Sequence, residues 1–320
     1  MSRPIDQLDA REFQHAFDSA ALDALRGTAG LDTLIRMFVK HGLERLFRIQ
    51  YTGSNLRVTA NNYPELLEIL TTASTTLAMP APPQLYLEWG GAINASTIGA
   101  EQPIVVLDSG CVDRLSPLEL SFVLGHEVGH VKCEHVVYHL LAQSICSLGE
   151  MVGDFTMGFG NLLTMPIRSA LHRWSRMSEL SADRAGLLAC QDIDSALSVM
   201  VKMAGLPASL NDRVCLPDFI QQAQEFEALD FEVVSKWMKM ALHSTQTHPW
   251  TVLRASELLK WHQSGDYQAV LDRTTRDRGR KRTIDGRAFC RNCSYRLDGT
   301  EAFCPNCGQE LLTALSAVAS

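Results

Sequence analysis

The residues with the clearest chemical potential form the stretch His126-Glu127-Val128-Gly129-His130. Two histidines four positions apart lie on one face of a helix, so both imidazole rings can reach the same metal ion. Zinc bound in this way lowers the pKa of a bound water molecule towards about 7 and polarises a carbonyl group. Glu127 follows the first histidine and lies near the ion without joining the ligand pair, where it can take the water proton. The spacing therefore predicts a site for hydrolysis by zinc-activated water.

A catalytic zinc site needs a third protein ligand and one open position. Metzincins take a further histidine shortly after the motif, following a glycine, but His135 does not fit that pattern. A better candidate is Glu179 in the segment Glu179-Leu-Ser-Ala-Asp183-Arg184. Glu179 and Asp183 share a helical face, so Glu179 can bind zinc while Asp183 accepts a hydrogen bond from a zinc-bound histidine. The alternatives are an exposed helical acid at Glu179 and an ion pair of Asp183 with Arg184 or another cation.

Two cysteine pairs near the end of the chain predict a second metal site. They are Cys290-Arg-Asn-Cys293 and Cys304-Pro-Asn-Cys307. Two residues between paired cysteines let a tight turn present two thiolates, and two such turns form a closed tetrahedral zinc site. So short a module has too little apolar core to fold without metal. We therefore expect a structural zinc ribbon, with a redox-active dithiol as the alternative, and two zinc ions per chain, one catalytic and one structural.

The charge pattern bears on the partners of this ribbon. The net charge of −7 argues against a general nucleic-acid binder. A basic run at 273–282 could contact phosphates, but it is interpreted as a solvated linker. Recruitment of a partner and a purely structural cap of the fold both stay open for the ribbon, whereas a nucleic acid is not expected.

The helix that carries the first two histidines has a clear start at Ser116-Pro117-Leu118-Glu119. Ser116 can cap the helix, proline suits the first helical position, and Glu119 completes a capping box. Apolar periodicity predicts further helices at 64–77, 168–189, 193–204, 217–241 and 249–264, and two amphipathic helices within 5–48, separated around Gly27–Gly30.

Three strands are predicted at 84–89, 93–98 and 103–108, with glycine turns between them. The connections are too short for parallel crossovers, so we expect a small antiparallel sheet. The fold class is therefore α+β and mostly helical.

The chain starts without the positively charged and then apolar run of a secretory signal. Five cysteines are scattered singly, which suits a reducing compartment, and we expect a cytoplasmic protein. The most apolar stretch, Val136–Ile167, is interrupted by Glu150 and Asp154, and neither half reaches the roughly 18–20 residues of a spanning helix. It is interpreted as two packed helices, with peripheral membrane contact as the alternative.

The order of several segments resembles the HtpX-type gluzincin peptidases, a family that includes Oma-type and CaaX prenyl protease branches. The similarity covers residues 60–265 and rests on Pro80, Leu85-Tyr86-Leu87, Asn94-Ala95, Ile104-Val105-Val106, Ser116–His130, Glu179–Arg184, and Thr247-His248-Pro249 followed by Arg254. Many members carry membrane helices that this chain does not show, and the family does not generally carry a cysteine-rich tail.

The resemblance implies roles for residues in this chain. His126, His130 and Glu179 would be the zinc ligands and Glu127 the general base. His248 would lie near the cleft and stabilise the tetrahedral oxyanion, unless it is only the histidine that precedes a helix.

The resemblance also implies where a substrate binds. The strand holding Asn94 and Ala95 would be the cleft edge, to which an extended peptide adds through main-chain hydrogen bonds; an ordinary sheet edge is the alternative. Arg254 would be a structural partner of a buried acid.

These observations predict an N-terminal helical region at 1–60, a zincin-like metallopeptidase domain at 61–267, a basic linker at 268–286 and the ribbon at 287–312. The expected activity is zinc-dependent endoproteolysis of proteins or peptides. The alternative is a zinc-ribbon recruitment protein whose peptidase domain is latent or inactive.

Overall fold

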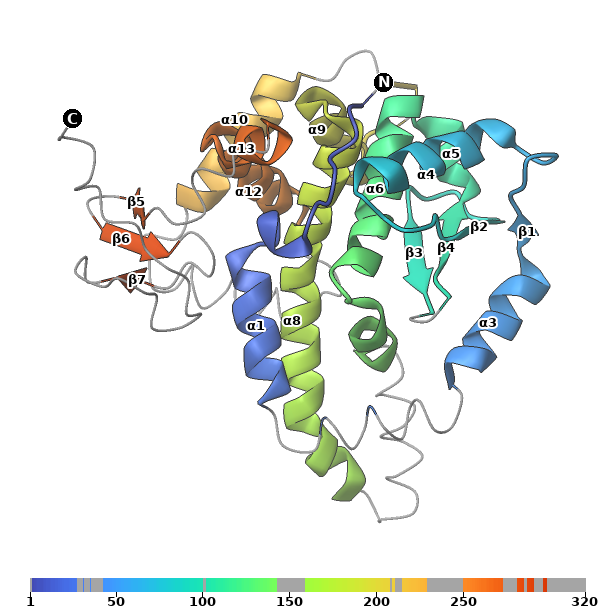
Figure 1. Ribbon diagram of the computed structural model, residues 1–320, viewed down its shortest axis with the longest axis horizontal. Coiled ribbons are helices and arrows are strands. Elements are labelled where there is room, and N and C mark those ends of the chain that lie inside the picture. The colour runs from blue at the N-terminus through green and yellow to red at the C-terminus, as the bar shows by residue number, and fades with distance from the viewer. Residues whose placement is uncertain are drawn as a thin grey trace.

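The computed structural model describes residues 2–27, 31, 35, 43–99, 102–142, 159–207, 209–210, 215–228, 250–272, 281–284, 287–290 and 296–297. The long helix α8 (Phe159–Cys190) runs through the middle of the molecule, beside α6 (Pro117–Lys132) (Figure 1). A four-stranded sheet lies on the α6 side of this pair, and helices from both ends of the chain lie on the other side. The pair α6 and α8 therefore forms the centre on which the other elements pack.

Most predicted helices are confirmed with boundaries shifted by a few residues, but the one predicted at 168–189 begins earlier, at Phe159. The remaining helices are η1 (Ala10–Glu12), α1 (Ala16–Arg26), α3 (Leu43–Ser54), α4 (Pro64–Thr76), α5 (Ser109–Arg114), α9 (Ile193–Met203), α10 (Leu216–Ala228), α12 (Thr251–Gln263) and α13 (Asp266–Asp272). The later part of the helix predicted at 217–241 lies outside the described residues. Residues 136–142 are also helical.

The capping box predicted for α6 is present. The Ser116 hydroxyl accepts a hydrogen bond from the Glu119 amide at 3.4 Å, and the Glu119 carboxylate accepts one from the Ser116 amide at 2.7 Å. Pro117 occupies the first helical position, where no amide donor is needed. At the other end, α6 stops at Lys132, and Glu134 takes a left-handed conformation with φ 58°. This turn brings His135 beside the last histidine of α6, His130, whose carbonyl oxygen accepts a hydrogen bond from the His135 amide at 2.9 Å.

Small residues let α6 and α8 approach closely. A Cβ atom at Gly129 would lie 2.5 Å from Cβ of Ala185, and one at Gly125 would lie 2.3 Å from Cβ of Ala189. On the facing helix, a Cβ atom at Gly186 would lie 2.7 Å from the carbonyl oxygen of Phe122. Since none of these neighbours is the end of a flexible side chain, any larger residue must push the helices apart.

We therefore expect Gly129→Ala to destabilise the fold by about 1–3 kcal/mol, because overpacking forces a backbone shift. Gly53→Ala is the matched control, since a Cβ atom at Gly53 on α3 meets nothing within 4 Å. There the same change should stabilise by about 0.5–1 kcal/mol through helix propensity. Urea unfolding of both variants measures whether each change lowers or raises the free energy of unfolding. A stabilising effect of Gly129→Ala would contradict the close packing of α6 and α8.

The four-stranded sheet is mixed, with strand order β1-β2-β4-β3. Its strands are β1 (Leu56–Arg57), β2 (Gln84–Glu88), β3 (Ala95–Ile98) and β4 (Ile104–Asp108). The predicted antiparallel arrangement is correct for β3 with β4 but wrong for β2 with β4, which are parallel. The connection between β2 and β4 contains β3, and this strand reverses the chain direction twice without a helical crossover. Short connections exclude a parallel pair only where strands adjacent in the chain are also adjacent in the sheet. Strands β2 and β3 are not adjacent in this sheet.

The central strand β4 contributes to the core on both faces. Val105 and Leu107 belong to an apolar cluster shared with α4 and α6, whereas Ile104 and Val106 belong to one shared with α8 and residues 136–142. The alternation follows from the two-residue period of a strand. Strand β3 pairs with β4 alone among the described strands, so it forms an edge of the sheet on the side of α6 (Figure 1).

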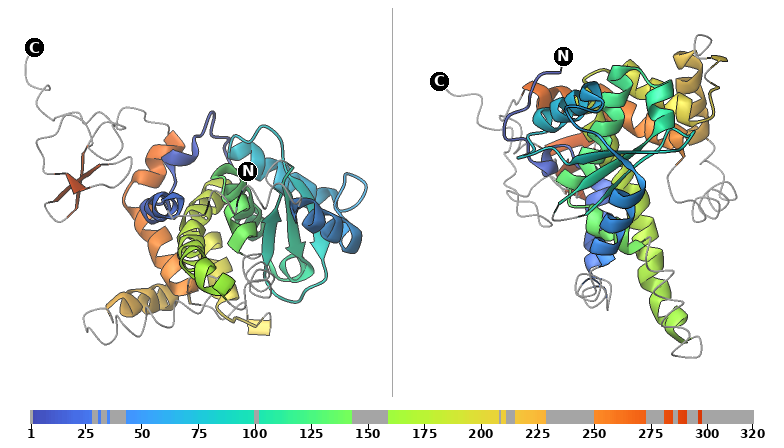
Figure 2. Two further views of the ribbon diagram at one scale, coloured as in Figure 1. Left: turned by 90° about the horizontal axis from the view of Figure 1, so that it is seen from below. Right: turned by 90° about the vertical axis from the view of Figure 1, so that its right-hand side faces the viewer.

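A separate three-stranded antiparallel sheet comprises β5 (Lys281–Ile284), β6 (Arg287–Cys290) and β7 (Arg296–Leu297). It lies on the opposite side of the molecule from the four-stranded sheet (Figures 1 and 2). Among the helices of the described residues, none combines the length and the apolar character that crossing a membrane requires. Part of the stretch Val136–Ile167, residues 143–158, lies outside the described residues.

Candidate metal centre

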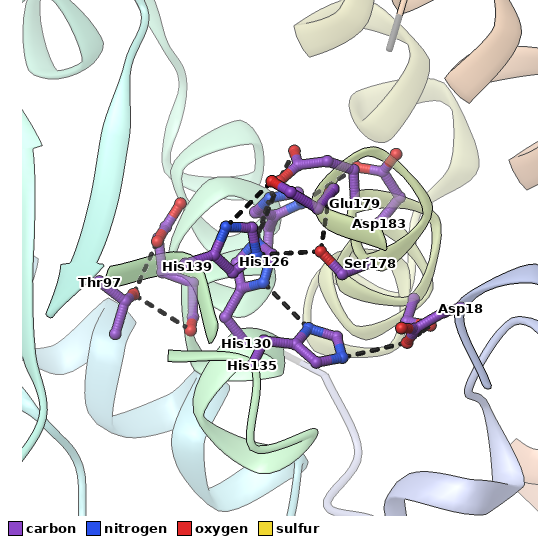
Figure 3. A network of polar contacts seen from close by, with 12 residues as sticks. Asp18, Thr97, His126, His130, His135, His139, Ser178, Glu179 and Asp183 are labelled. Atoms are coloured by element: carbon purple, nitrogen blue, oxygen red, sulfur yellow. Dashed lines mark hydrogen bonds and ion pairs between the residues drawn. The ribbon is translucent and has the colours of Figure 1, made fainter. Parts of the chain in front are cut away.

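His126 and His130 on α6 meet Glu179 on α8 at one point between the two helices (Figure 3). Their Nε2 atoms are 3.1 Å apart. The Glu179 carboxylate lies 3.5 Å from Nε2 of His126 and 3.4 Å from Nε2 of His130. All three side chains are buried. The structure thus brings together the three residues that the sequence predicted to bind one ion.

This donor set fits zinc. Ligand atoms about 2.0–2.1 Å from a tetrahedral zinc ion lie about 3.3 Å from one another. The two Nε2 atoms are 3.1 Å apart, and each lies 3.4–3.5 Å from one of the two carboxylate oxygens of Glu179, which is close to that value. Two imidazole nitrogens and one carboxylate also form a ligand set known from catalytic zinc sites, where a fourth position stays open for water.

Asp183 and Arg254 support the first histidine from behind. Asp183 Oδ1 lies 3.0 Å from Nδ1 of His126, so with its proton on Nδ1 this ring donates to Asp183 and directs Nε2 at the centre. Arg254 on α12 donates to both carboxylate oxygens of Asp183, at 2.8 and 2.6 Å. Its Nη1 also lies 3.6 Å from Glu179. Glu179 is 3% exposed, so it is not the exposed acid of the alternative. The ion pair expected as the alternative for Asp183 is present with another cation, Arg254, beside the contact with His126.

The electrostatics of the site favour positive charge at its centre. Burial lowers the pKa of His126, but the contacts with Asp183 and Glu179 outweigh it and raise that pKa to about 10. Burial also raises the pKa of Asp183, but the charge of Arg254 outweighs it and lowers that pKa. At His130 burial dominates and lowers the pKa. Two carboxylates, Asp183 and Glu179, lie beside these two imidazoles and form a site that a divalent cation would satisfy.

Glu127 lies beside this centre but is not one of its three converging residues. Its side chain is buried, and Oε2 accepts a hydrogen bond of 2.6 Å from the hydroxyl of Thr97. Thr97 belongs to the edge strand β3, and sequence reasoning did not identify it. A lone threonine in a short strand carries no signal of such a contact, which depends on how the sheet packs against α6.

His130 makes a second contact that sequence reasoning missed. Its Nδ1 lies 3.1 Å from Nδ1 of His135, and Nε2 of His135 lies 3.0 Å from Oδ2 of Asp18 on α1 (Figure 3). His135 and Asp18 are 0% exposed at their side chains. The position of His135 does not fit the metzincin pattern of zinc ligands, and no sequence motif connects it with Asp18.

A second group of histidines, His130, His135 and His139, also has ligand atoms close enough for a metal ion. Hydrogen bonds account for its members. The ring nitrogens of His139 lie 2.9 Å from the hydroxyl of Ser178 and 3.2 Å from that of Ser175. Both groups contain His130, but the first group uses its Nε2 atom and this group uses its Nδ1 atom.

The structure places the other predicted residues as follows. Ala95 lies in the edge strand β3, directly after Asn94, whose carbonyl oxygen accepts a hydrogen bond from the amide of Asp108. Cys290 ends strand β6. Four predicted residues lie outside the described part of the chain: His248, Cys293, Cys304 and Cys307.

Comparison with known proteins adds independent information. The sequence model of the family described as "Peptidase family M48" matches residues 60–262. The chain is 31% identical over 272 residues to the "Plastoglobule-localized metallopeptidase 48, chloroplastic" of Arabidopsis thaliana, covering 84% of this chain and 77% of that protein.

Shorter matches link the chain to bacterial and archaeal proteins. It is 26% identical over 177 residues to the "Protease HtpX homolog 2" of Methanosarcina mazei, covering 48% of this chain and 60% of that protein. It is 26% identical over 174 residues to the "Protease HtpX homolog" of Burkholderia multivorans, covering 47% and 61%. The chain thus spans less than two thirds of these two relatives, and no solved structure matches it significantly.

Proposed function

The chain belongs to peptidase family M48, and we propose that it is a zinc-dependent endopeptidase that hydrolyses protein or peptide chains with metal-activated water. The observation that supports this most strongly is the convergence of His126, His130 and Glu179 beside a separate buried carboxylate, Glu127. A purely structural zinc site has no need of such a base. The peptidase assignment itself follows from the family and from the metallopeptidase names of the relatives.

The residues divide the chemistry between them. His126, His130 and Glu179 would hold a zinc ion, which when bound lowers the pKa of water and polarises a carbonyl group. Glu127 accepts the proton of the attacking water and returns it to the leaving amine. Asp183 keeps the proton of His126 on Nδ1, so that Nε2 remains free to bind the metal. Arg254 holds Asp183 ionised and in place.

The edge strand β3 would bind the substrate. The amide of Asp108 donates to the carbonyl oxygen of Asn94, so the pairing pattern directs the main-chain groups of Ala95 and Thr97 away from β4. An extended peptide can add to this edge through main-chain hydrogen bonds. Because Thr97 also contacts Glu127, a peptide on this edge would lie beside the catalytic base.

Further parts of this proposal come from the sequence. His248 would stabilise the tetrahedral oxyanion. The four cysteines of the ribbon would bind a structural zinc ion, and the ribbon would recruit a partner rather than a nucleic acid. The division into four regions at 1–60, 61–267, 268–286 and 287–312 and a cytoplasmic location stay predictions, while one relative is named for the plastoglobule.

The metal content of the purified chain tests the two zinc sites together. We expect two zinc ions per chain by mass spectrometry, and one in His126→Ala, which should also lose cleavage of an unfolded protein substrate. His262→Ala on α12 is the matched control and should keep both ions and full activity. Two ions retained in His126→Ala would exclude the proposed ligand set.

The contact between Thr97 and Glu127 predicts a smaller kinetic effect. Thr97→Val keeps the shape of the side chain but removes the donor to Glu127. A hydrogen bond to a charged group contributes about 1.5–3 kcal/mol. We therefore expect kcat to fall about tenfold with KM nearly unchanged, as steady-state kinetics would show. Thr71→Val, an exposed change on α4, should leave both constants unchanged, and an unaltered kcat in Thr97→Val would exclude a role for this contact.

A further inference from the structure

The second nitrogen of the zinc ligand His130 begins a buried chain of contacts that leads out of the peptidase domain. Nδ1 of His130 faces Nδ1 of His135 at 3.1 Å, and Nε2 of His135 faces Asp18 at 3.0 Å. Asp18 lies on α1, outside the residues 60–262 that match the family. Figure 3 shows Asp18, His135 and His130 arranged in this order, with His126 and Glu179 beyond them.

The charge at Asp18 determines the position of each proton along this chain. Burial raises the pKa of Asp18, but His135 and the hydrogen bonds to Asp18 outweigh it and lower that pKa to about 2. An ionised carboxylate only accepts hydrogen bonds, so the proton of His135 must be on Nε2. In the neutral ring, Nδ1 of His135 then carries a lone pair and accepts a hydrogen bond from the N–H group at Nδ1 of His130. His130 is left with a lone pair on Nε2, the atom that faces Glu179.

Three further donors hold the Asp18 carboxylate in place. Trp174 donates to Oδ1 at 3.0 Å, and Ser181 and Gln14 donate to Oδ2 at 2.6 and 3.1 Å. Trp174 and Ser181 are on α8, the helix that also carries Glu179. Asp18 is therefore positioned relative to the same helix that supplies the third ligand.

We propose that Asp18 and His135 are positioning residues that hold His130 in the tautomer able to bind zinc, so that helix α1 is part of the catalytic zinc site. This inference rests on the proposed zinc peptidase function. It gives the two histidine ligands equivalent support: Asp183 directly behind His126, and Asp18 behind His130 through one intervening ring. Removal of α1 would then lower the zinc affinity of the site. If the N-terminal region were inhibitory instead, its removal would raise the activity.

The substitution Asp18→Asn tests the proposal because it reverses the proton order without a change in shape. Indole nitrogen is a donor only, so Trp174 requires the new amide oxygen at the Oδ1 position. The amide nitrogen then faces His135 and donates to Nε2, which moves the proton of His135 to Nδ1. That proton opposes the proton on Nδ1 of His130 and favours the tautomer in which Nε2 cannot bind metal.

We expect the zinc affinity of the catalytic site to fall about 10–100-fold in Asp18→Asn, as for other groups that orient zinc-bound histidines. Competition with a chelator on the full chain measures it, with His126→Ala in parallel to identify the zinc that belongs to the ribbon. Asp23→Asn, the same chemical change at an exposed position of α1, is the matched control. It leaves Asp18 and its donors in place, so it should leave zinc affinity unchanged.

A second readout does not depend on affinity. Nitrogen NMR of the histidine rings in the zinc-loaded wild type should show His135 protonated on Nε2 and unprotonated on Nδ1. A proton on Nδ1 of His135, or wild-type zinc affinity in Asp18→Asn, would overturn the inference while leaving the peptidase proposal intact. If the wild type binds no zinc outside the ribbon, the proposed function itself fails, and the two failures are thus distinguishable.

Discussion

Replacement of Glu127 by glutamine should lower kcat by about 10²–10⁴-fold, the usual contribution of a positioned general base. Glutamine has the same shape as glutamate, but its amide cannot accept the proton of the attacking water. The three converging metal-binding residues do not include Glu127, so the variant should bind as much zinc as the wild type. Substrate affinity should also change little, because the substitution keeps the packing of the buried side chain. Cleavage of an unfolded protein substrate, with zinc content measured on the same samples, checks these expectations.

The matched control for this experiment is Glu65→Gln, the same chemical change at an exposed position in the first turn of α4. It should cleave at the wild-type rate. Equal activity of Glu127→Gln and the wild type would exclude Glu127 as the base. If the wild type cleaves none of a varied set of substrates, the chain is better explained as a recruitment protein with a latent or inactive peptidase domain.

Replacement of Arg254 by methionine should destabilise the folded chain by about 3–5 kcal/mol, because it leaves a buried carboxylate without its cation. Arg254 is 4% exposed and Asp183 is 1% exposed, so water cannot replace the lost contacts. Both hydrogen bonds from Arg254 to Asp183 disappear in the variant. Urea unfolding at neutral pH measures the loss. Arg57→Met, an exposed change on β1, is the matched control and should alter stability by less than about 0.5 kcal/mol.

The double variant Arg254→Met with Asp183→Asn separates loss of packing from loss of charge. Asparagine at position 183 has no charge that needs a cation. The double variant should therefore recover part of the stability that Arg254→Met loses. If the double variant is less stable than Arg254→Met alone, the penalty does not arise from an unpaired carboxylate at Asp183.

This ion pair also gives stability a defined pH dependence. Burial raises the pKa of Asp183, but Arg254 outweighs it and keeps the folded-state pKa below the ordinary value of 3.8. The stabilisation is therefore fully present above that ordinary value and is lost as the pH falls through the folded-state pKa. The stability difference between the wild type and Arg254→Met should thus narrow in acid, and a difference that widened below pH 4 would contradict the sign of the shift.

The sequence by itself determined the local parts of the site. A capping box and an apolar period place His126 and His130 on one helical face, because helix geometry depends on residues a few positions apart. The same spacing argument paired Glu179 with Asp183. The need for a third zinc ligand selected Glu179 on a downstream helix, the family resemblance implied the same residue, and the distances between the three side chains agree with both.

Only the tertiary structure decided which distant residues complete the site. The parallel pairing of β2 and β4, the contact between Thr97 and Glu127, and the chain from Asp18 through His135 to His130 all join segments far apart in the sequence. Such contacts depend on how whole elements pack, for example on the glycines that let α6 approach α8. A single aspartate in the first helix carries no local signal of its partner. Its proposed role follows from the position of α1 against α8, where His135 and three donors keep Asp18 ionised despite its burial.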